Sequence, residues 1–177
     1  MIHFIQKEAS QMITYQQLCE QNDLYRTTLI NRKKKLQESI GDFAHEIAKD
    51  LGLVGKYYQE PFSSNTNFIK KPYFKLLALE NEEEINPYKI SVEFDNNGNP
   101  SASVGLSVTL EKDANTYPKT NLYIRTQFTL KDNKLLLSFV DFDDGLQISI
   151  DLDDSNKWSY AIEAYKQMVM RSCTLPM

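Results

Sequence analysis

The spacing of the apolar residues changes once along the chain, and this change constrains the fold more than any other feature. Up to Leu51 apolar side chains recur at steps of three, four or seven residues, which is the spacing of one face of an α-helix. From Tyr73 to Leu152 they recur at every second residue, as in strands that bury one face in an antiparallel sheet. The chain is therefore predicted to be an α+β protein.

Local signals divide the chain into three regions. Residues 1–54 are predicted to be helical, beginning at a capping box formed by Thr14 and Gln17 and ending at Gly52. Gly41 lies inside this pattern and is expected to divide it in two. Residues 55–72 form a polar connector with two prolines. Residues 73–177 are predicted to form an antiparallel meander of about five or six strands and a C-terminal helix. The alternative is one compact domain over the whole length.

Turn signals and a final apolar stripe complete this expectation. Asp, Asn and Gly at 95–99, 132–133 and 143–145 favour tight hairpin turns between the strands. The C-terminal helix is expected to begin at Ser155 and to pack on the buried face of the sheet through a stripe of Trp158, Ile162, Tyr165 and Val169.

Bulk properties indicate a globular protein of the cytoplasm. The net charge is −4, with 41% hydrophobic and 25% charged residues, which is an ordinary globular balance. We find no signal-peptide pattern at the start and no apolar run that approaches the length of a membrane span, so no membrane partner is predicted. Cys19 and Cys173 are expected to be free thiols.

The segment 14–35, TYQQLCEQNDLYRTTLINRKKK, resembles a helix-turn-helix motif. Leu18 and Cys19 stand as its apolar–small pair, and the turn is expected at Asn22 and Asp23. The resemblance implies a recognition helix that opens at the base edges and ends on phosphates, with Tyr25, Arg26, Thr27, Thr28, Arg32, Lys33 and Lys34 as the DNA-binding residues. The alternative is an amphipathic helix pair with a solvated basic turn, which the net negative charge favours.

An acidic segment, Asp141 to Asp154, suggests a contact surface for a basic partner. It does not fit an EF-hand, because Gly145 comes one position early and Leu152 stands in place of the final Glu, so no metal site is predicted. Aspartates at the hairpin and on the wet face of the last strand would instead make an acidic stripe, formed by Asp143, Asp144, Asp151 and Asp153. The alternative is a solvated face that discourages aggregation.

Aromatic residues of the connector suggest a second contact. Tyr57, Tyr58 and Phe62 lie in a polar segment, and exposed aromatics are common anchors at protein interfaces. The alternative is that they cover an edge of the sheet.

Catalytic patterns are poor in this sequence. His3 and His45 are the two histidines, and no zinc-binding, thiol-redox or phosphate-loop motif is present. We therefore predict no catalytic residue, no metal and no cofactor. Our first hypothesis is a non-enzymatic module that binds another protein, such as an inhibitor or antidote of a toxin or defence protein, or an adaptor. A DNA-binding regulator is the alternative, an enzyme that uses carboxylates alone is the third hypothesis, and a homodimer remains open.

Overall fold

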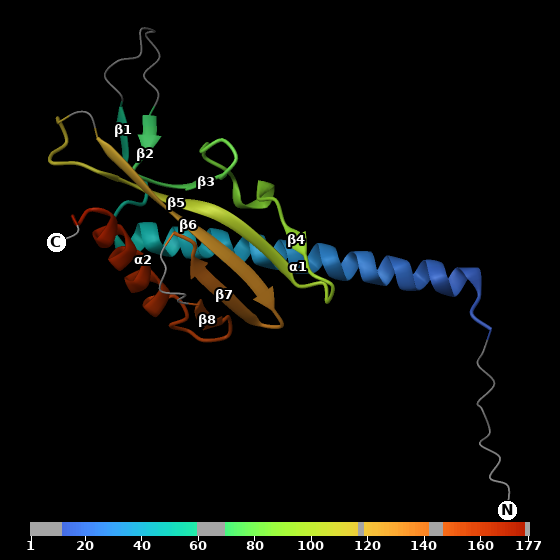
Figure 1. Cartoon of the computed structure of the whole chain (residues 1–177). Coiled ribbons are helices and arrows are strands. Elements are labelled where there is room, and N and C mark those ends of the chain that lie inside the picture. Colours follow the sequence, from blue (N-terminus) through green and yellow to red (C-terminus); the bar gives the residue numbers. More distant parts are fainter. Residues whose placement is uncertain (1–11, 60–69, 117–118, 142–146, 176–177) are drawn as a thin grey trace, which may run out of the picture.

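The protein has two layers, an antiparallel sheet and two helices that share one of its faces (Figure 1). The computed structural model describes residues 12–59, 70–116, 119–141 and 147–175. Helix α1 spans Tyr15–Asp50 and helix α2 spans Ser159–Ser172. The α+β class, the antiparallel sheet and a C-terminal helix packed against it are thus confirmed.

The main sheet has six strands, and its second half is the expected meander. The order is β3-β5-β6-β7-β8, and β4 pairs with β5 beyond the end of β3. The bounds are β3 Phe74–Leu77, β4 Glu93–Phe94, β5 Pro100–Leu110, β6 Thr120–Lys131, β7 Lys134–Phe139 and β8 Gln147–Asp151. A separate pair, β1 Tyr57–Gln59 and β2 Lys70–Pro72, makes a short arm, and a 3-10 helix η1 spans Pro87–Lys89.

Alternation along the strands places the hydrophobic core on one face of the sheet, although the second half of β5 is buried on both faces, at Gly105, Ser107 and Thr109 as well as on the core side. Strand β8 has exposed residues at its odd positions and buries Ile148 and Ile150 between them. The buried face meets both helices, and Phe43 of α1 is central to this contact: its ring centroid lies 6.0 Å from that of Phe128 and 5.2 Å from that of Trp158. The opposite face of the sheet exposes polar residues that include Ser103, Gln127, Gln147 and Ser149.

Helix α1 begins and ends at the predicted signals. The backbone nitrogen of Gln17 donates to Oγ1 of Thr14 at 3.2 Å, and the backbone nitrogen of Thr14 donates to Oε1 of Gln17 at 2.8 Å, so the capping box is confirmed. Leu51 is the C-cap, and Gly52 follows with φ +69°, a left-handed conformation that glycine adopts without steric cost.

Two expected interruptions of this helix are wrong. Asn22 and Asp23 are helical, so residues 15–50 form one helix of 36 residues rather than several. No glycine or proline lies near the expected turn, and Asn and Asp cost a helix interior only a few tenths of a kcal/mol, roughly, which the neighbouring turns override. Gly41 does not break the helix either, because a single glycine costs a helix only about 1 kcal/mol, and Pro87 of η1 lies where its side chain would be.

Smaller differences lie at the other end and in the first part of the sheet. Helix α2 begins at Ser159, with Trp158 as N-cap and without a side-chain cap, rather than at Ser155. The alternating segment around Ile90 forms only the two-residue strand β4.

Cys19 and Cys173 are free and exposed, as predicted. Neither helix in the described part of the chain combines the length and the apolarity that crossing a bilayer requires.

Candidate functional site

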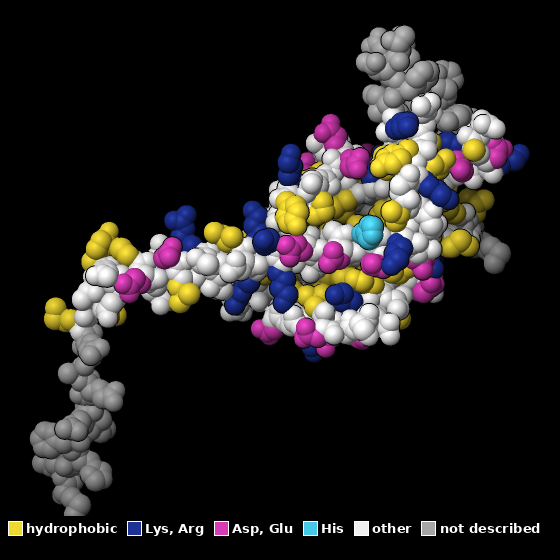
Figure 2. All heavy atoms as spheres, turned by 180° about the vertical axis from the view of Figure 1, so that it is seen from behind, with side chains coloured by type: hydrophobic (Ala, Val, Ile, Leu, Met, Phe, Trp, Pro, Cys, Tyr) yellow, Lys and Arg dark blue, Asp and Glu magenta, His cyan; other side chains and the backbone are white. Residues whose placement is uncertain are grey.

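The N-terminal part of α1 extends beyond the sheet. Every residue from Tyr15 to Thr27 is exposed, whereas from Leu36 onward one face of the helix is buried. Figure 2 shows this end of the helix standing clear of the body of the molecule. We call Tyr15–Thr27 the overhang. At 1.5 Å of rise per residue it is about 20 Å long.

One apolar face runs through both halves of the helix. Steps of three and four residues connect the positions of this face, which we call the seam: Tyr15, Leu18, Asn22, Tyr25 and Leu29, continued by Arg32, Leu36, Ile40, Phe43 and Ile47. The last four are fully buried against the sheet and α2. Leu18 and Tyr25 lie on the same side of the helix but are each 57% exposed. The core-facing side of α1 therefore continues past the edge of the sheet without a covering element among the described residues.

Two hydrogen-bonded contacts mark where the overhang meets the body. Nη1 of Arg32 donates to the backbone oxygens of Asn97 and Gly98, at 3.1 and 3.0 Å. Nζ of Lys35 donates to Oδ1 of Asn133 at 2.6 Å, in the turn between β6 and β7. Leu29 also lies close to the turn at Gly98, and N-terminal to it no described residue outside α1 and its cap covers the helix.

Charges around the seam are not evenly distributed. Arg26 and Lys33 are exposed, and each lies four residues after one seam residue and three residues before another, so both border the seam. Glu20 and Asp23 are also exposed, but the helical repeat places them away from the seam. The seam is therefore bordered by positive charge, and the acidic side chains of this part of the helix face elsewhere.

The residues predicted to bind DNA lie on one straight helix rather than on a recognition helix set across a second one. The helix-turn-helix geometry is thus corrected, because the backbone hydrogen-bond ladder runs through the expected turn. Two of these residues have local partners: Oγ1 of Thr28 donates to the backbone oxygen of Leu24 at 2.8 Å, and Arg32 contacts the turn at Gly98. The others are exposed, namely Tyr25, Arg26, Thr27, Lys33 and Lys34.

In the described part of the predicted acidic stripe, a lysine of the neighbouring strand lies beside an aspartate. Asp151 is exposed on the outer face of β8 and lies opposite Lys134 of β7 in the ladder. The carboxylate of Asp153 accepts a hydrogen bond from Nδ2 of Asn133. Asp143 and Asp144 lie outside the described residues. In the described segments, no three His, Cys, Asp or Glu side chains come together in a way that could hold a metal ion.

The aromatic connector separates into one exposed and one buried tyrosine. Tyr57 is exposed in β1. Tyr58 is buried, with its ring centroid 5.1 Å from that of Tyr73 and the ammonium of Lys119 above both rings. Tyr58 is therefore a packing residue at the base of the arm rather than an exposed anchor. Phe62 lies outside the described residues.

A carboxylate, that of Glu111, holds the foot of the β1–β2 arm in place. Oε2 of Glu111 accepts a hydrogen bond from the Tyr73 hydroxyl at 2.6 Å and pairs with the ammonium of Lys119. These two hydrogen bonds, the one from Lys119 first, hold the pKa of Glu111 below its usual range. The cluster has the character of a structural clamp between the arm and β5.

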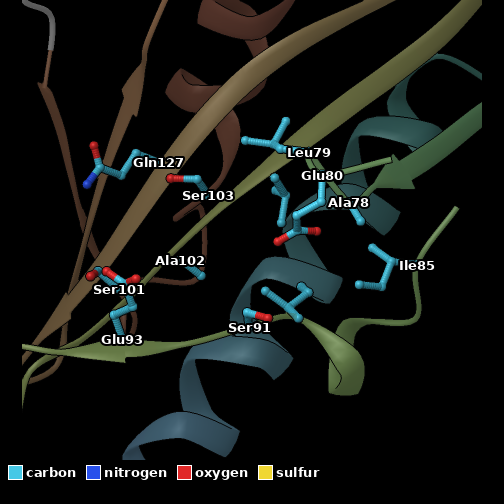
Figure 3. Close-up of a pocket in the computed structure, with 12 residues that line it drawn as sticks. Ala78, Leu79, Glu80, Ile85, Ser91, Glu93, Ser101, Ala102, Ser103 and Gln127 are labelled. Carbon is cyan, nitrogen blue, oxygen red and sulfur yellow. The ribbon is translucent and has the colours of Figure 1, made fainter. Parts of the chain in front are cut away.

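A small hollow opens where the sheet edge is incomplete. β3 ends opposite Gly105 and β4 begins opposite Ser101, so in the described chain no strand lies beside residues 102–104 of β5 on that side. The hollow has a volume of about 230 Å³, and Figure 3 shows Glu80, Ser91, Glu93, Ser103 and Gln127 around it. A carboxylate-based reaction, our third hypothesis, would have to use Glu80 and Glu93 here.

The sequence did not indicate that the seam would be exposed. Leu18, Tyr25 and Leu29 belonged to the predicted helical pattern, but the same spacing describes a buried helix face. The useful signal was that this spacing runs unbroken from residue 15 to residue 47, with a capping box only at its start.

Comparison with known protein families, curated proteins and solved structures finds no match for this chain.

Proposed function

We propose that this chain is a non-enzymatic protein-binding module, either an inhibitor or antidote of a toxin or defence protein, or an adaptor. The observation that carries the proposal is the overhang, whose seam exposes Tyr15, Leu18 and Tyr25 on the side of α1 that elsewhere packs on the sheet. Large apolar side chains exposed together on one helix face are typical of interaction sites. A helix that is anchored in a core and bears such a seam is ready to receive a partner.

Energetics support a partner for this segment. Isolated helices of this length are marginal in water, and most helical stability in proteins comes from packing of the apolar face. The overhang has no such packing among the described residues. A partner that covers the seam removes apolar side chains from water, at roughly 25 cal/mol per Å² of buried apolar surface.

Two exposed residues supply secondary contacts in this proposal. Tyr57 on the arm and Asp151 on the outer face of the sheet are exposed. Asp153 of the predicted acidic surface is exposed as well, but its carboxylate already accepts a hydrogen bond from Asn133. Changing Asp151 to Lys should weaken the partner and leave the circular dichroism spectrum native, and an unchanged affinity would remove the acidic face from the proposal.

The alternative function, a DNA-binding regulator, is favoured by one observation, the exposed cations Lys33 and Lys34 beside Arg26. Such a regulator would bind duplex DNA with an affinity that falls steeply with salt, because each neutralised phosphate releases counterions. Changing Lys33 and Lys34 together to Glu would abolish that binding.

The test is capture of the partner from native lysate, with and without nuclease, using matched variants. The seam variant carries Leu18→Ser and Tyr25→Ser, and the control carries Leu24→Ser and Ile30→Ser, which are 61% and 62% exposed but lie off the seam. We expect one protein in stoichiometric amount, resistant to nuclease, captured by wild type and control and lost from the seam variant. Equal capture by all three would reject the seam, and a nuclease-sensitive catch would favour the regulator.

A further inference from the structure

We propose that the seam of the overhang binds an amphipathic helix of the partner protein that carries acidic side chains beside its own apolar residues. The two helices would form a short two-stranded coiled coil. This inference rests on the proposed protein-binding function and specifies the chemistry of the partner.

The spacing of the seam is that of a coiled coil. From Tyr15 to Arg32 the steps alternate strictly between three and four residues, which gives the seven-residue repeat that keeps two helices in contact as they wind around each other. Leu18 and Tyr25 provide exposed apolar knobs, whereas Leu29 is half-buried beside the turn at Gly98. Asn22 lies between Leu18 and Tyr25, and a single Asn at such a position fixes the register of the two helices at some cost in stability.

The overhang is already a helix before any partner arrives. Its capping box is complete, and Nε2 of Gln16 donates to Oε1 of Glu20 at 3.0 Å, one turn later. The same helix continues into the packed segment that begins at Leu36. Binding therefore does not require nucleation of the first helical turn on this side, which reduces the entropy cost of association.

The residues that border the seam indicate the sign of the partner's charge. In a coiled coil the positions on either side of the apolar seam form ion pairs with the opposite helix. Here these positions hold three cations and no acid: Thr14, Cys19, Gln21, Arg26, Thr28, Lys33 and Lys35. Lys35 already contacts Asn133, which leaves Arg26 and Lys33 for a partner. Acidic residues at the bordering positions of the partner helix would pair with both.

A second copy of this chain does not satisfy these cations. Each copy supplies the same seven bordering residues, so in either direction Arg26 and Lys33 would face neutral or basic side chains. Glu20 and Asp23 cannot take part, because they lie off the seam. An acidic partner helix pairs with the charges that a homodimer would leave without partners.

The experiment uses the full chain and synthetic helical peptides of about three heptads. One peptide has Leu in its seam and Glu at the bordering positions, a second has Lys in place of Glu, and a third keeps Glu but has Ser in the seam. Binding to labelled peptide is followed by fluorescence anisotropy. The protein is wild type or carries Arg26→Glu with Lys33→Glu, two substitutions at exposed residues.

We expect wild type to bind the Glu peptide about ten-fold more tightly than the Lys peptide, and the charge-reversed protein to invert that preference. The peptide with Ser in its seam should not bind. Equal affinity for the Glu and Lys peptides, or no binding of either, would overturn the inference. It would also fall if the chain sediments as a dimer that Leu18→Ser dissociates, or if duplex DNA binds in place of the peptides.

The lysate capture separates this inference from the proposed function. A partner lost from the seam variant but retained by the charge-reversed protein would leave the protein-binding function in place and reject the acidic helix. Loss from both variants, with the off-seam control intact, supports the two together.

Discussion

Nη1 of Arg32 lies 3.0 Å from the backbone oxygen of Gly98, and this contact joins α1 to the turn before β5 just after the overhang ends. The turn fits closely, since Gly98 has φ +72° and a Cβ built there would lie 3.0 Å from that same nitrogen and 3.2 Å from Cδ2 of Leu29. The exposed half of the helix is therefore attached to the sheet by a specific contact as well as by its continuity with the core.

Changing Arg32 to Ala should lower the free energy of unfolding by about 1 kcal/mol, because the guanidinium donates to two carbonyl oxygens of the turn. Urea unfolding followed by circular dichroism measures this change. Lys33→Ala is the control, since Lys33 is exposed on the adjacent position of the same helix. If both variants unfold at the same urea concentration as wild type, the contact with Gly98 contributes nothing.

The close approach of η1 to α1 predicts an unusual response at Gly41. Ala is favoured over Gly in a helix by about 1 kcal/mol, so Gly41→Ala would normally stabilise. Here the new Cβ would lie 2.9 Å from Cγ of Pro87, which forces the two elements apart. We expect Gly41→Ala to destabilise the wild-type protein and to be tolerated better in the Pro87→Ala variant, which lacks Cγ but keeps a Cβ 3.2 Å from the new methyl group. A double-mutant cycle from urea unfolding tests this, and additive effects would contradict it.

Burial of Tyr165 predicts a loss of stability at alkaline pH. Its hydroxyl donates to the backbone oxygen of Leu106 at 3.1 Å, and burial raises the pKa of Tyr165 well above its usual value of 10.0. Above that value the unfolded chain loses the proton while the folded chain retains it. Stability is therefore complete below about pH 10 and falls as the pH rises further, by at most about 1.4 kcal/mol per pH unit.

Tyr165→Phe isolates this effect. The variant should lose about 1 kcal/mol at neutral pH with the hydrogen bond, but its stability should fall less between about pH 8 and pH 11 than that of wild type. Urea unfolding at both pH values gives the comparison. An identical loss in the two proteins would show that Tyr165 ionises as easily in the folded chain as in the unfolded one.

The overhang should exchange its amide hydrogens faster than the rest of α1. Its backbone is helical, but no other element in the described part of the chain packs on residues 16–27, whereas residues 36–50 are anchored by the core. Hydrogen–deuterium exchange read by mass spectrometry should show this gradient along one helix, and the partner should slow exchange in the overhang. Uniform protection along α1 in the protein alone would contradict the exposed state of the seam.

Most of the fold could be predicted because its signals are local. The capping box at Thr14, the helix end at Gly52 and the alternation along β8 each depend on neighbouring residues only. Gly41 shows the opposite case. Pro87, which is distant in the sequence, fills the space that a side chain at this position would occupy, so the glycine serves a tertiary contact that no local pattern shows.

The candidate surfaces were harder to predict, since exposure depends on what other parts of the chain cover. Tyr57 and Tyr58 are adjacent and chemically identical, yet Tyr73 and Lys119 bury only the second. Leu18 and Phe43 belong to the same seam, and the extent of the sheet and of the α2 region decides which of them is buried. No pattern within the helix itself contains that extent.

The unbroken course of α1 has a mechanical consequence. A bend at Asn22 and Asp23 would have let the N-terminal part of the helix change its orientation, and a bound partner would have taken many orientations relative to the sheet. A single rod supported at Arg32 and Lys35 behaves as a cantilever instead, so that a load at Tyr15 is borne by those supports and then by the core. A partner bound to the overhang is therefore held at a fixed angle to the sheet.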